Sequence, residues 1–218
     1  MSVRWLLYIG GMLISLSAFA ANPLVQIKTN MGTMVFELYP AKAPLTVKNF
    51  LAYVDSGYYD GTIFHRAINH FIIQGGGYTA NLKPKPTLPP IPNEAGNGLK
   101  NLPGALAMAR SYNPNSATSQ FFINMDDNKF LNHYRNNADY YGYCVFGRVV
   151  EGMAVAKKIA ALPTAAKGFL REDVPIKTVL IEDAKIIDRL PAAIGKGKQG
   201  RVLGAGPHHR KKHKESHG

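Results

Sequence analysis

An arginine and a glutamine interrupt two otherwise apolar, strand-like segments between residues 64 and 76, and they constrain the chain more than any other feature. The segment reads Phe-His-Arg-Ala-Ile-Asn-His-Phe-Ile-Ile-Gln-Gly-Gly, with the cation at Arg66 and the amide at Gln74. Burying a guanidinium is costly unless its fixed, planar set of donors has a use. The segment therefore predicts a pair of strands that carries a functional cation.

Taken singly, these residues have ordinary explanations. A strand arginine is most often solvated or part of a rim ion pair, and a lone glutamine before glycine is most often a turn residue. Two further apolar segments follow, Ser-Gln-Phe-Phe-Ile-Asn-Met at residues 119–125 and Tyr-Cys-Val-Phe-Gly-Arg-Val at residues 143–149. In this order, the three segments resemble the cyclophilin family of peptidyl-prolyl cis/trans isomerases, most closely its bacterial periplasmic members.

Hydrophobic periodicity predicts mostly strands. Residues 24–29 alternate as a half-buried strand does, residues 30–32 offer a hairpin turn, and residues 33–39 return antiparallel. A last strand is predicted over residues 176–187. Many strands and few helices favour a closed antiparallel barrel. The family resemblance implies a mainly β fold, an eight-stranded antiparallel β-barrel capped by two α-helices.

Two segments have helical periodicity instead. Pro44 suits a first helical turn, and apolar residues at helical spacing follow it: Val47, Phe50, Leu51 and Val54. The second helix is predicted over residues 153–162, before Pro163. The long, proline-rich interval 78–103 predicts a loop that wraps the barrel and frames a substrate groove.

Rotation about an X–Pro bond breaks no bond and moves no proton, and its barrier of about 18–20 kcal/mol comes from the partial double bond. A donor to the prolyl nitrogen helps because its contact strengthens only in the twisted state. The resemblance implies Arg66 as the catalytic donor and no cofactor. It also implies substrate-binding residues: Phe71, Ile72 and Phe122 in the proline pocket; Met108, Phe130 and Leu131 at its edge; Gln74 and Gln120 on the substrate backbone and Arg66; and Ala109 and Arg110 along the groove.

Three site residues depart from the best-known eukaryotic pattern. Phe130 stands in place of a tryptophan, Tyr143 in place of a histidine and Ile72 in place of a methionine. All three keep an apolar wall, so turnover is expected to survive. Phe130 lacks the indole N–H that sensitive relatives offer to cyclosporin, so weak inhibition by that ligand is expected.

Both ends of the chain differ in composition from the middle. Arg4, an apolar run and the small residues Ala18 and Ala20 predict a secretory signal over residues 1–20, cleaved before Ala21. The expected location is the periplasm; the alternatives are a secreted protein or one anchored in the membrane by an uncleaved signal. The isomerase domain is then residues 21–191, with no stable membrane anchor after cleavage.

Residues 192–218 predict a disordered, basic tail rich in lysine and histidine. Its four histidines form a candidate weak metal site, and no metal site is predicted in the domain: His208, His209, His213 and His217. An anionic surface is another candidate partner for the tail, and a dispensable solvated extension is the plainest alternative.

Half of the net charge of +12 lies in this tail, so the domain is only moderately basic and no nucleic acid is required as a partner. Cys144 is the only cysteine, which excludes an intrachain disulfide and predicts a small buried side chain. The expected partners are proline-containing unfolded or extended polypeptides, and the chain is expected to be a monomer. Two functions remain open: an isomerase that assists folding of exported proteins, or a proline-peptide-binding chaperone with incidental catalysis.

Overall fold

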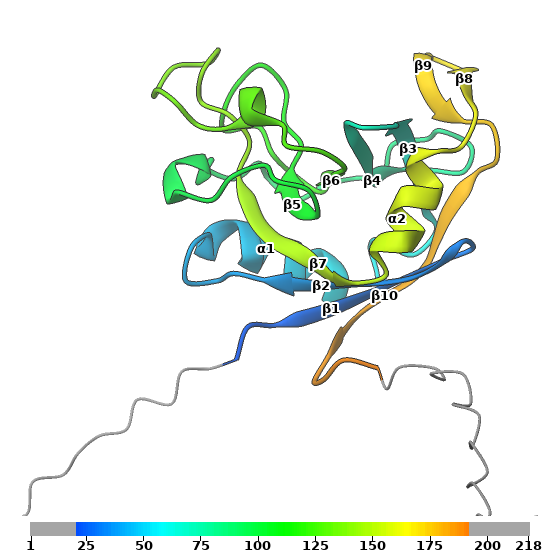
Figure 1. Ribbon diagram of the computed structural model, residues 1–218, viewed down its shortest axis with the longest axis horizontal. Coiled ribbons are helices and arrows are strands. Elements are labelled where there is room, and N and C mark those ends of the chain that lie inside the picture. The colour runs from blue at the N-terminus through cyan, green and yellow to red at the C-terminus, as the bar shows by residue number, and fades with distance from the viewer. Residues whose placement is uncertain (1–20, 192–218) are drawn as a thin grey trace, which may run out of the picture.

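The computed structural model describes residues 21–191, which form a closed β-barrel with two helices against it (Figure 1). Neighbouring barrel strands pair antiparallel in the closed order β1-β10-β3-β4-β6-β5-β7-β2. The strands are β1 (Leu24–Thr29), β2 (Gly32–Leu38), β3 (Thr62–Ile68), β4 (Ile72–Thr79), β5 (Ala105–Met108), β6 (Phe121–Asn124), β7 (Val145–Glu151) and β10 (Val179–Ile187). The predicted eight-stranded barrel is confirmed.

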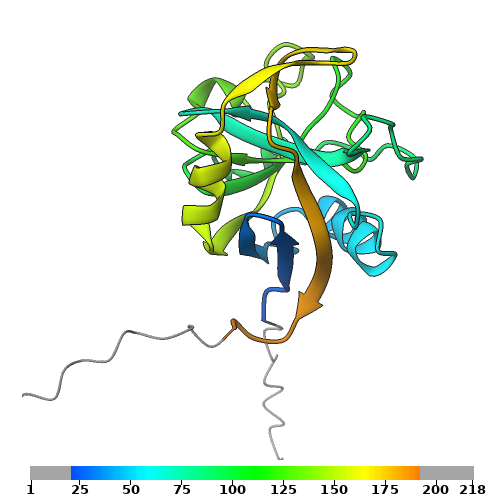
Figure 2. The ribbon, with the colours of Figure 1, turned by 90° about the vertical axis from the view of Figure 1, so that its right-hand side faces the viewer.

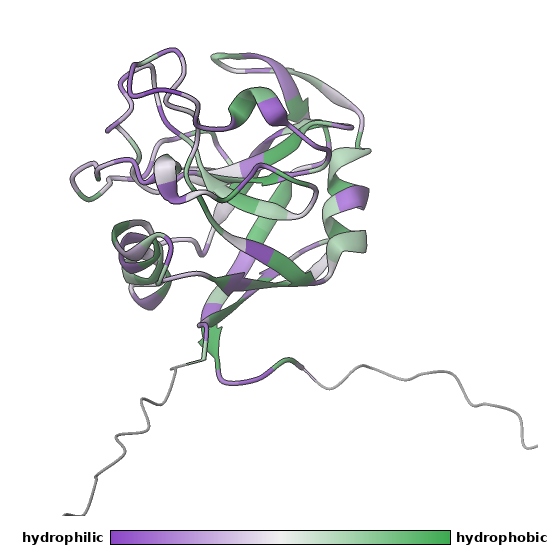
Figure 3. Cartoon of the chain, turned by 60° about the vertical axis from the view of Figure 1, so that its left-hand side comes forward, coloured by the Kyte–Doolittle hydropathy of each residue, from purple (hydrophilic) through white to green (hydrophobic). Residues whose placement is uncertain are grey.

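The first hairpin shows how the sequence produces this arrangement. Leu24 pairs with Glu37 and Thr29 with Gly32, so the turn is two residues long. Along β1, Val25 and Ile27 are fully buried while their neighbours are not, as period-two alternation requires. Apolar positions likewise gather along the strands crossing the molecule in Figure 3, and the outer loops are mostly hydrophilic.

The helices lie against the barrel at separate places (Figures 1 and 2). Helix α1 (Pro44–Asp55) begins at the proline that the sequence indicated and buries Val47, Phe50 and Val54, whereas Leu51 is only half-buried. Inside the barrel, Phe50 packs edge-on against Phe121 with ring centroids 5.5 Å apart.

Helix α2 (Met153–Ala160) ends two residues earlier than predicted. Ile159 is fully buried in the core, and Leu162 still packs partly against it from beyond the helix end. Ile159 and Leu162 both pack toward the core, as the predicted apolar face requires. The helix ends at Ala160, however, so Pro163 lies three residues beyond its last residue.

A small second sheet, β8 (Thr164–Lys167) with β9 (Leu170–Pro175), was not predicted. All four residues of β8 are exposed, so the strand has no apolar alternation to reveal it. The predicted last strand is also too long: β10 begins at Val179, and Ile176 is 66% exposed. The hairpin formed by β8 and β9 projects beside β3 in Figure 1, and β9 packs against β3.

The predicted long loop is present between β4 and β5, with one short 3-10 turn, Ala95–Asn97. It is fastened to the barrel at several points. Ile91 pairs with Ala117, and the Glu94 carboxylate accepts hydrogen bonds from the first turn of α1. Within residues 21–191, no helix is long and apolar enough to span a membrane.

Candidate active site

Arg66 lies on β3 opposite Gln74 of β4, and its side chain is 39% exposed. Its Nε donates to Oδ2 of Asp173 at 3.3 Å, and its guanidinium carbon lies 5.9 Å from the centroid of the Phe71 ring. The expectation that Gln74 and Gln120 would hold Arg66 is therefore wrong in detail. The contact that holds the guanidinium comes from β9 instead.

A hollow of about 150 Å³ adjoins this guanidinium. Arg66 lines it together with Phe71, Ile72, Gln74, Ala109, Arg110, Phe122, Leu131 and Tyr143. Strand alternation explains the arrangement on β6, where Phe121 packs into the barrel core while Phe122 faces outward into the hollow. The result is a hollow with the Arg66 guanidinium at its edge and the apolar side chains of Phe71, Phe122 and Leu131 in its wall.

Two residues expected at the edge of the pocket lie elsewhere. Met108 is buried in the barrel core, because on β5 it is Ala105 and Ala107 that face outward. Phe130 does not line the hollow; it is 69% exposed and stacks on Phe71, with ring centroids 5.5 Å apart. Phe130 instead lines a separate hollow with Tyr134, Arg135, Asp139 and Tyr140.

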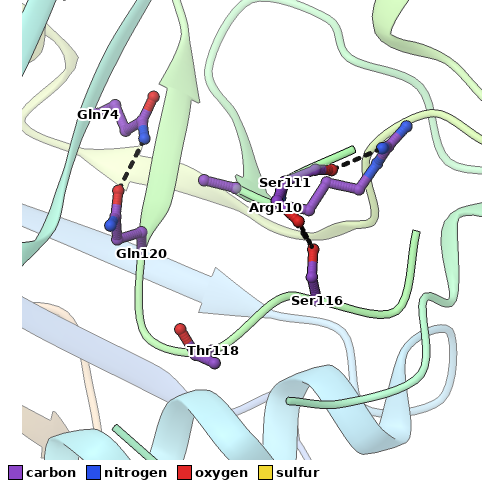
Figure 4. A pocket seen from close by; sticks show the side chains of 7 residues that line it. Gln74, Arg110, Ser111, Ser116, Thr118 and Gln120 are labelled. Carbon is purple, nitrogen blue, oxygen red and sulfur yellow. Dashed lines mark hydrogen bonds between the residues drawn. The ribbon is translucent and has the colours of Figure 1, made fainter. Parts of the chain in front are cut away.

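A second hollow of about 310 Å³ extends from the first and shares Gln74, Ala109 and Arg110 with it. Its other lining residues are Ser111, Ser116, Thr118 and Gln120 (Figure 4). Gln74 donates to Gln120 at 2.9 Å in the lining of the second hollow. A Cβ on Gly77 would lie 2.5 Å from the Gln120 side chain, so any larger residue there would force Gln120 to move from this position.

The guanidinium of Arg110 has a structural role. Its nitrogens donate to the backbone carbonyls of Ser111, Tyr112, Ala138 and Gly142. Its guanidinium carbon also lies 4.7 Å from the centroid of the Tyr143 ring. Arg110 therefore fixes the loop that carries Tyr143, whereas the Nη groups of Arg66 have no hydrogen-bond partner within residues 21–191.

Buried asparagines support the wall of the first hollow from behind, and sequence reasoning missed them. Asn128 donates to the carbonyl of Phe71 at 2.9 Å, and Asn101 donates to that of Leu131 at 3.1 Å. Asn124 joins them, accepting from Asn128 and donating to Asn101. Each buried amide has partners, so this network can hold the backbone that carries the pocket residues.

Two buried titratable groups lie close to the site. Burial lowers the pKa of His65, the neighbour of Arg66, to about 4, and its Nδ1 has no hydrogen-bond partner. Burial also raises the pKa of the Cys144 thiol to about 11, as expected for a thiol with a packing role.

Residues 21–191 hold no group of three or more metal-ligating side chains. The candidate site at His208, His209, His213 and His217 lies outside the described residues, as does the predicted signal.

Comparison with known proteins agrees with this geometry. Residues 24–186 match the family model of the cyclophilin type peptidyl-prolyl cis-trans isomerases. A peptidyl-prolyl cis-trans isomerase of Acinetobacter baylyi is 52% identical over 183 residues, which cover 84% of this chain and 95% of that protein. Peptidyl-prolyl cis-trans isomerase B of Escherichia coli is 51% identical over 163 residues, covering 75% of this chain and 99% of that protein.

Solved structures show the same fold. A cyclophilin type peptidyl-prolyl cis-trans isomerase of Cryptosporidium parvum superposes with a TM-score of 0.62 at 32% identity, covering 78% of this chain and 99% of that one. Its structure in the presence of the dipeptide Ala-Pro gives a TM-score of 0.61 at 33% identity, covering 76% and 99%. With its closed barrel, its apolar hollow beside Arg66 and these relatives, the chain belongs to the cyclophilin family of peptidyl-prolyl cis-trans isomerases.

Proposed function

We propose that this isomerase rotates X–Pro bonds with Arg66 as the catalytic residue that donates to the prolyl nitrogen. The observation that carries the proposal is the position of a permanently charged, planar donor at the edge of the hollow lined by Phe71, Phe122 and Leu131. The proline ring occupies that hollow. As the bond twists, the nitrogen lone pair is released and becomes an acceptor, so the contact with Arg66 strengthens where the barrier is highest.

The substrate is an extended, proline-containing polypeptide that continues from the first hollow into the second. Gln74 and Ala109 border both hollows, and Gln120 borders the second, so their polar groups can bind the substrate backbone on either side of the proline. The Cryptosporidium parvum relative, whose structure was determined in the presence of Ala-Pro, supports this class of ligand. We expect one chain to form a complete site, because every site residue comes from residues 66–143.

The alternative is a proline-peptide-binding chaperone in which catalysis is incidental. A binder needs only the hollow, and a cation at its edge adds desolvation cost without a matching gain in binding. Arg66 therefore favours the enzyme.

We also propose that the enzyme acts outside the cytoplasm, on exported proteins in the periplasm. The support is the sequence of residues 1–20, with Arg4, an apolar run and small residues before Ala21. Fractionation of a bacterium expressing the full chain, with N-terminal sequencing, tests this. A mature protein that starts at Ala21 in the periplasmic fraction is expected, and an uncleaved cytoplasmic protein would contradict it.

The test of the catalytic assignment is Arg66→Ala, compared with wild type by prolyl exchange on short X–Pro peptides. Losing a charged donor that acts in the twisted state is expected to lower kcat/KM at least about tenfold. Lys129→Ala is a matched control, because it removes an exposed cation whose only ion pair within residues 21–191 is with Asp127. Near wild-type exchange by a folded Arg66→Ala protein would refute the assignment.

A further inference from the structure

The β8–β9 hairpin lies outside the barrel and yet supplies the charged partner of Arg66. Asp173 is on β9, separated from Arg66 by 107 positions in the sequence, and its Oδ2 accepts from Nε at 3.3 Å. The side chains are 39% exposed for Arg66 and 24% exposed for Asp173, so the pair is partly withdrawn from solvent. Because both side chains still contact solvent, their ion pair adds little stability, so we look for its role in the orientation of the Arg66 guanidinium.

The hairpin is fixed at both ends, which makes Asp173 a defined anchor point. Next to it, Val174 is buried at 3% exposure and pairs with Ala165. Toward the tip, the Phe169 ring packs on Tyr78 with centroids 5.4 Å apart, and Tyr78 packs on His65 at 4.8 Å. The carboxylate is therefore presented from a fastened segment beside β3.

The backbone at Asp173 is also unusual. Its φ is +62°, in the left-handed region that side-chain-bearing residues seldom occupy, although Asp and Asn tolerate it better than most. Glycine would fit this conformation more easily, so a carboxylate at this position points to a use for the side chain.

The geometry divides the donors of Arg66 into two sets. Asp173 takes the Nε–H, and the Phe71 ring lies near one side of the guanidinium. The Nη N–H groups have no partner within the described residues, and Arg66 lines the proline hollow. Because the guanidinium is planar, a bond to Nε restricts rotation about the last torsions of the side chain and so fixes where the Nη groups lie.

We propose that Asp173 is a positioning residue, which holds Arg66 by Nε so that the Nη donors stay directed at the prolyl nitrogen in the neighbouring hollow. This rests on the catalytic role proposed for Arg66. Asp173 itself does not line either substrate hollow, so its removal should weaken the binding of the twisted state rather than that of the ground-state substrate.

The experiment compares Asp173→Asn and Asp173→Gly with wild type. Both substitutions suit a left-handed backbone; Asn keeps a neutral acceptor, and Gly removes it. For Asp173→Gly, kcat should fall about five- to tenfold with KM changed less than about twofold, since small misplacements of catalytic groups are costly. For Asp173→Asn, kcat should fall less than for Asp173→Gly. Glu172→Gln, which removes an exposed charge from the same strand, should match wild type.

Two further measurements separate positioning from a general effect on the hairpin. In an Arg66→Ala background, Asp173→Gly should cause no additional loss, because the group it positions is gone. In wild type, the Nε–Hε NMR signal of Arg66 should move on Asp173→Asn. An Asp173→Gly protein with wild-type kcat, or an equal loss in both backgrounds, would overturn the proposal. If Arg66→Ala is itself fully active, the catalytic assignment of Arg66 fails instead.

Discussion

Glu94 caps helix α1 from the long loop, 49 positions further along the chain than Leu45, and its removal should destabilise the fold measurably. The helix starts at Pro44 without a side-chain cap from Ala43. The Glu94 carboxylate replaces that cap, accepting from the N–H of Leu45 at 3.1 Å and of Thr46 at 2.8 Å. It also accepts from the Thr46 hydroxyl at 2.7 Å.

The expected loss can be built from these contacts. Removing a cap typically costs about 1 kcal/mol, and a negative charge at a helix N-terminus adds about 0.3–1 kcal/mol. Thr46 is 1% exposed, and its hydroxyl would lose its best acceptor, leaving only the Cys144 sulfur at 3.4 Å. We expect Glu94→Ala to lower the free energy of unfolding by about 2–3 kcal/mol and Glu94→Gln by about 1 kcal/mol.

Urea unfolding of residues 21–191 at neutral pH measures this directly, and the loss for Glu94→Ala corresponds to a Tm lower by roughly 5–10 °C. Asp55→Ala is the matched control, because Asp55 is an exposed acid at the other end of the same helix, where its removal should be neutral or slightly stabilising. Neither change touches a substrate hollow, so kcat/KM of the folded protein should be preserved. A loss below about 0.5 kcal/mol for Glu94→Ala would refute the capping argument.

Four other outcomes are expected. The pKa of His65 is about 4 in the folded protein, below its ordinary value of 6.5, so the unfolded chain binds the proton at higher pH than the folded one does. The free energy of unfolding of wild type should therefore fall as pH falls from 6.5 toward 4, and urea unfolding of His65→Phe should lack this part of the pH dependence. Cys144, with its pKa raised to about 11, should resist iodoacetamide at pH 8 until urea unfolds the protein. Phe130→Trp should strengthen cyclosporin inhibition; equal inhibition of both proteins would contradict the role of the missing N–H. A chain ending at Pro191 should keep full activity on short peptides and lose affinity for nickel resin; a truncated protein that fails to catalyse, or that still binds the resin as tightly, would show that the tail is not an independent appendage.

Sequence reasoning succeeded where one physical signal dominated. Alternating burial marks β1, and a proline followed by residues at helical spacing marks α1, so both begin where the pattern indicates. The apolar residues of the proline hollow were named through the family motif, since nothing in Phe122 alone separates a pocket wall from a core residue. Met108 shows the limit of this approach. Neighbouring residues of β5 face opposite sides of the sheet, and the motif did not show that Met108 faces the core while Ala107 faces outward.

The features that pattern could not supply are those made by long-range polar contacts. No pattern in the sequence singles out the asparagines behind the pocket wall, yet their amides are buried because each finds a partner across the fold. Asp173 lies in a hairpin with an exposed first strand, and only closure of the barrel brings it to Arg66. An arginine within an apolar strand indicates that it has a partner elsewhere in the fold, since its charge is costly to leave unpaired. The sequence motif identifies the cation, but its orientation is set by a segment that has no apolar pattern of its own.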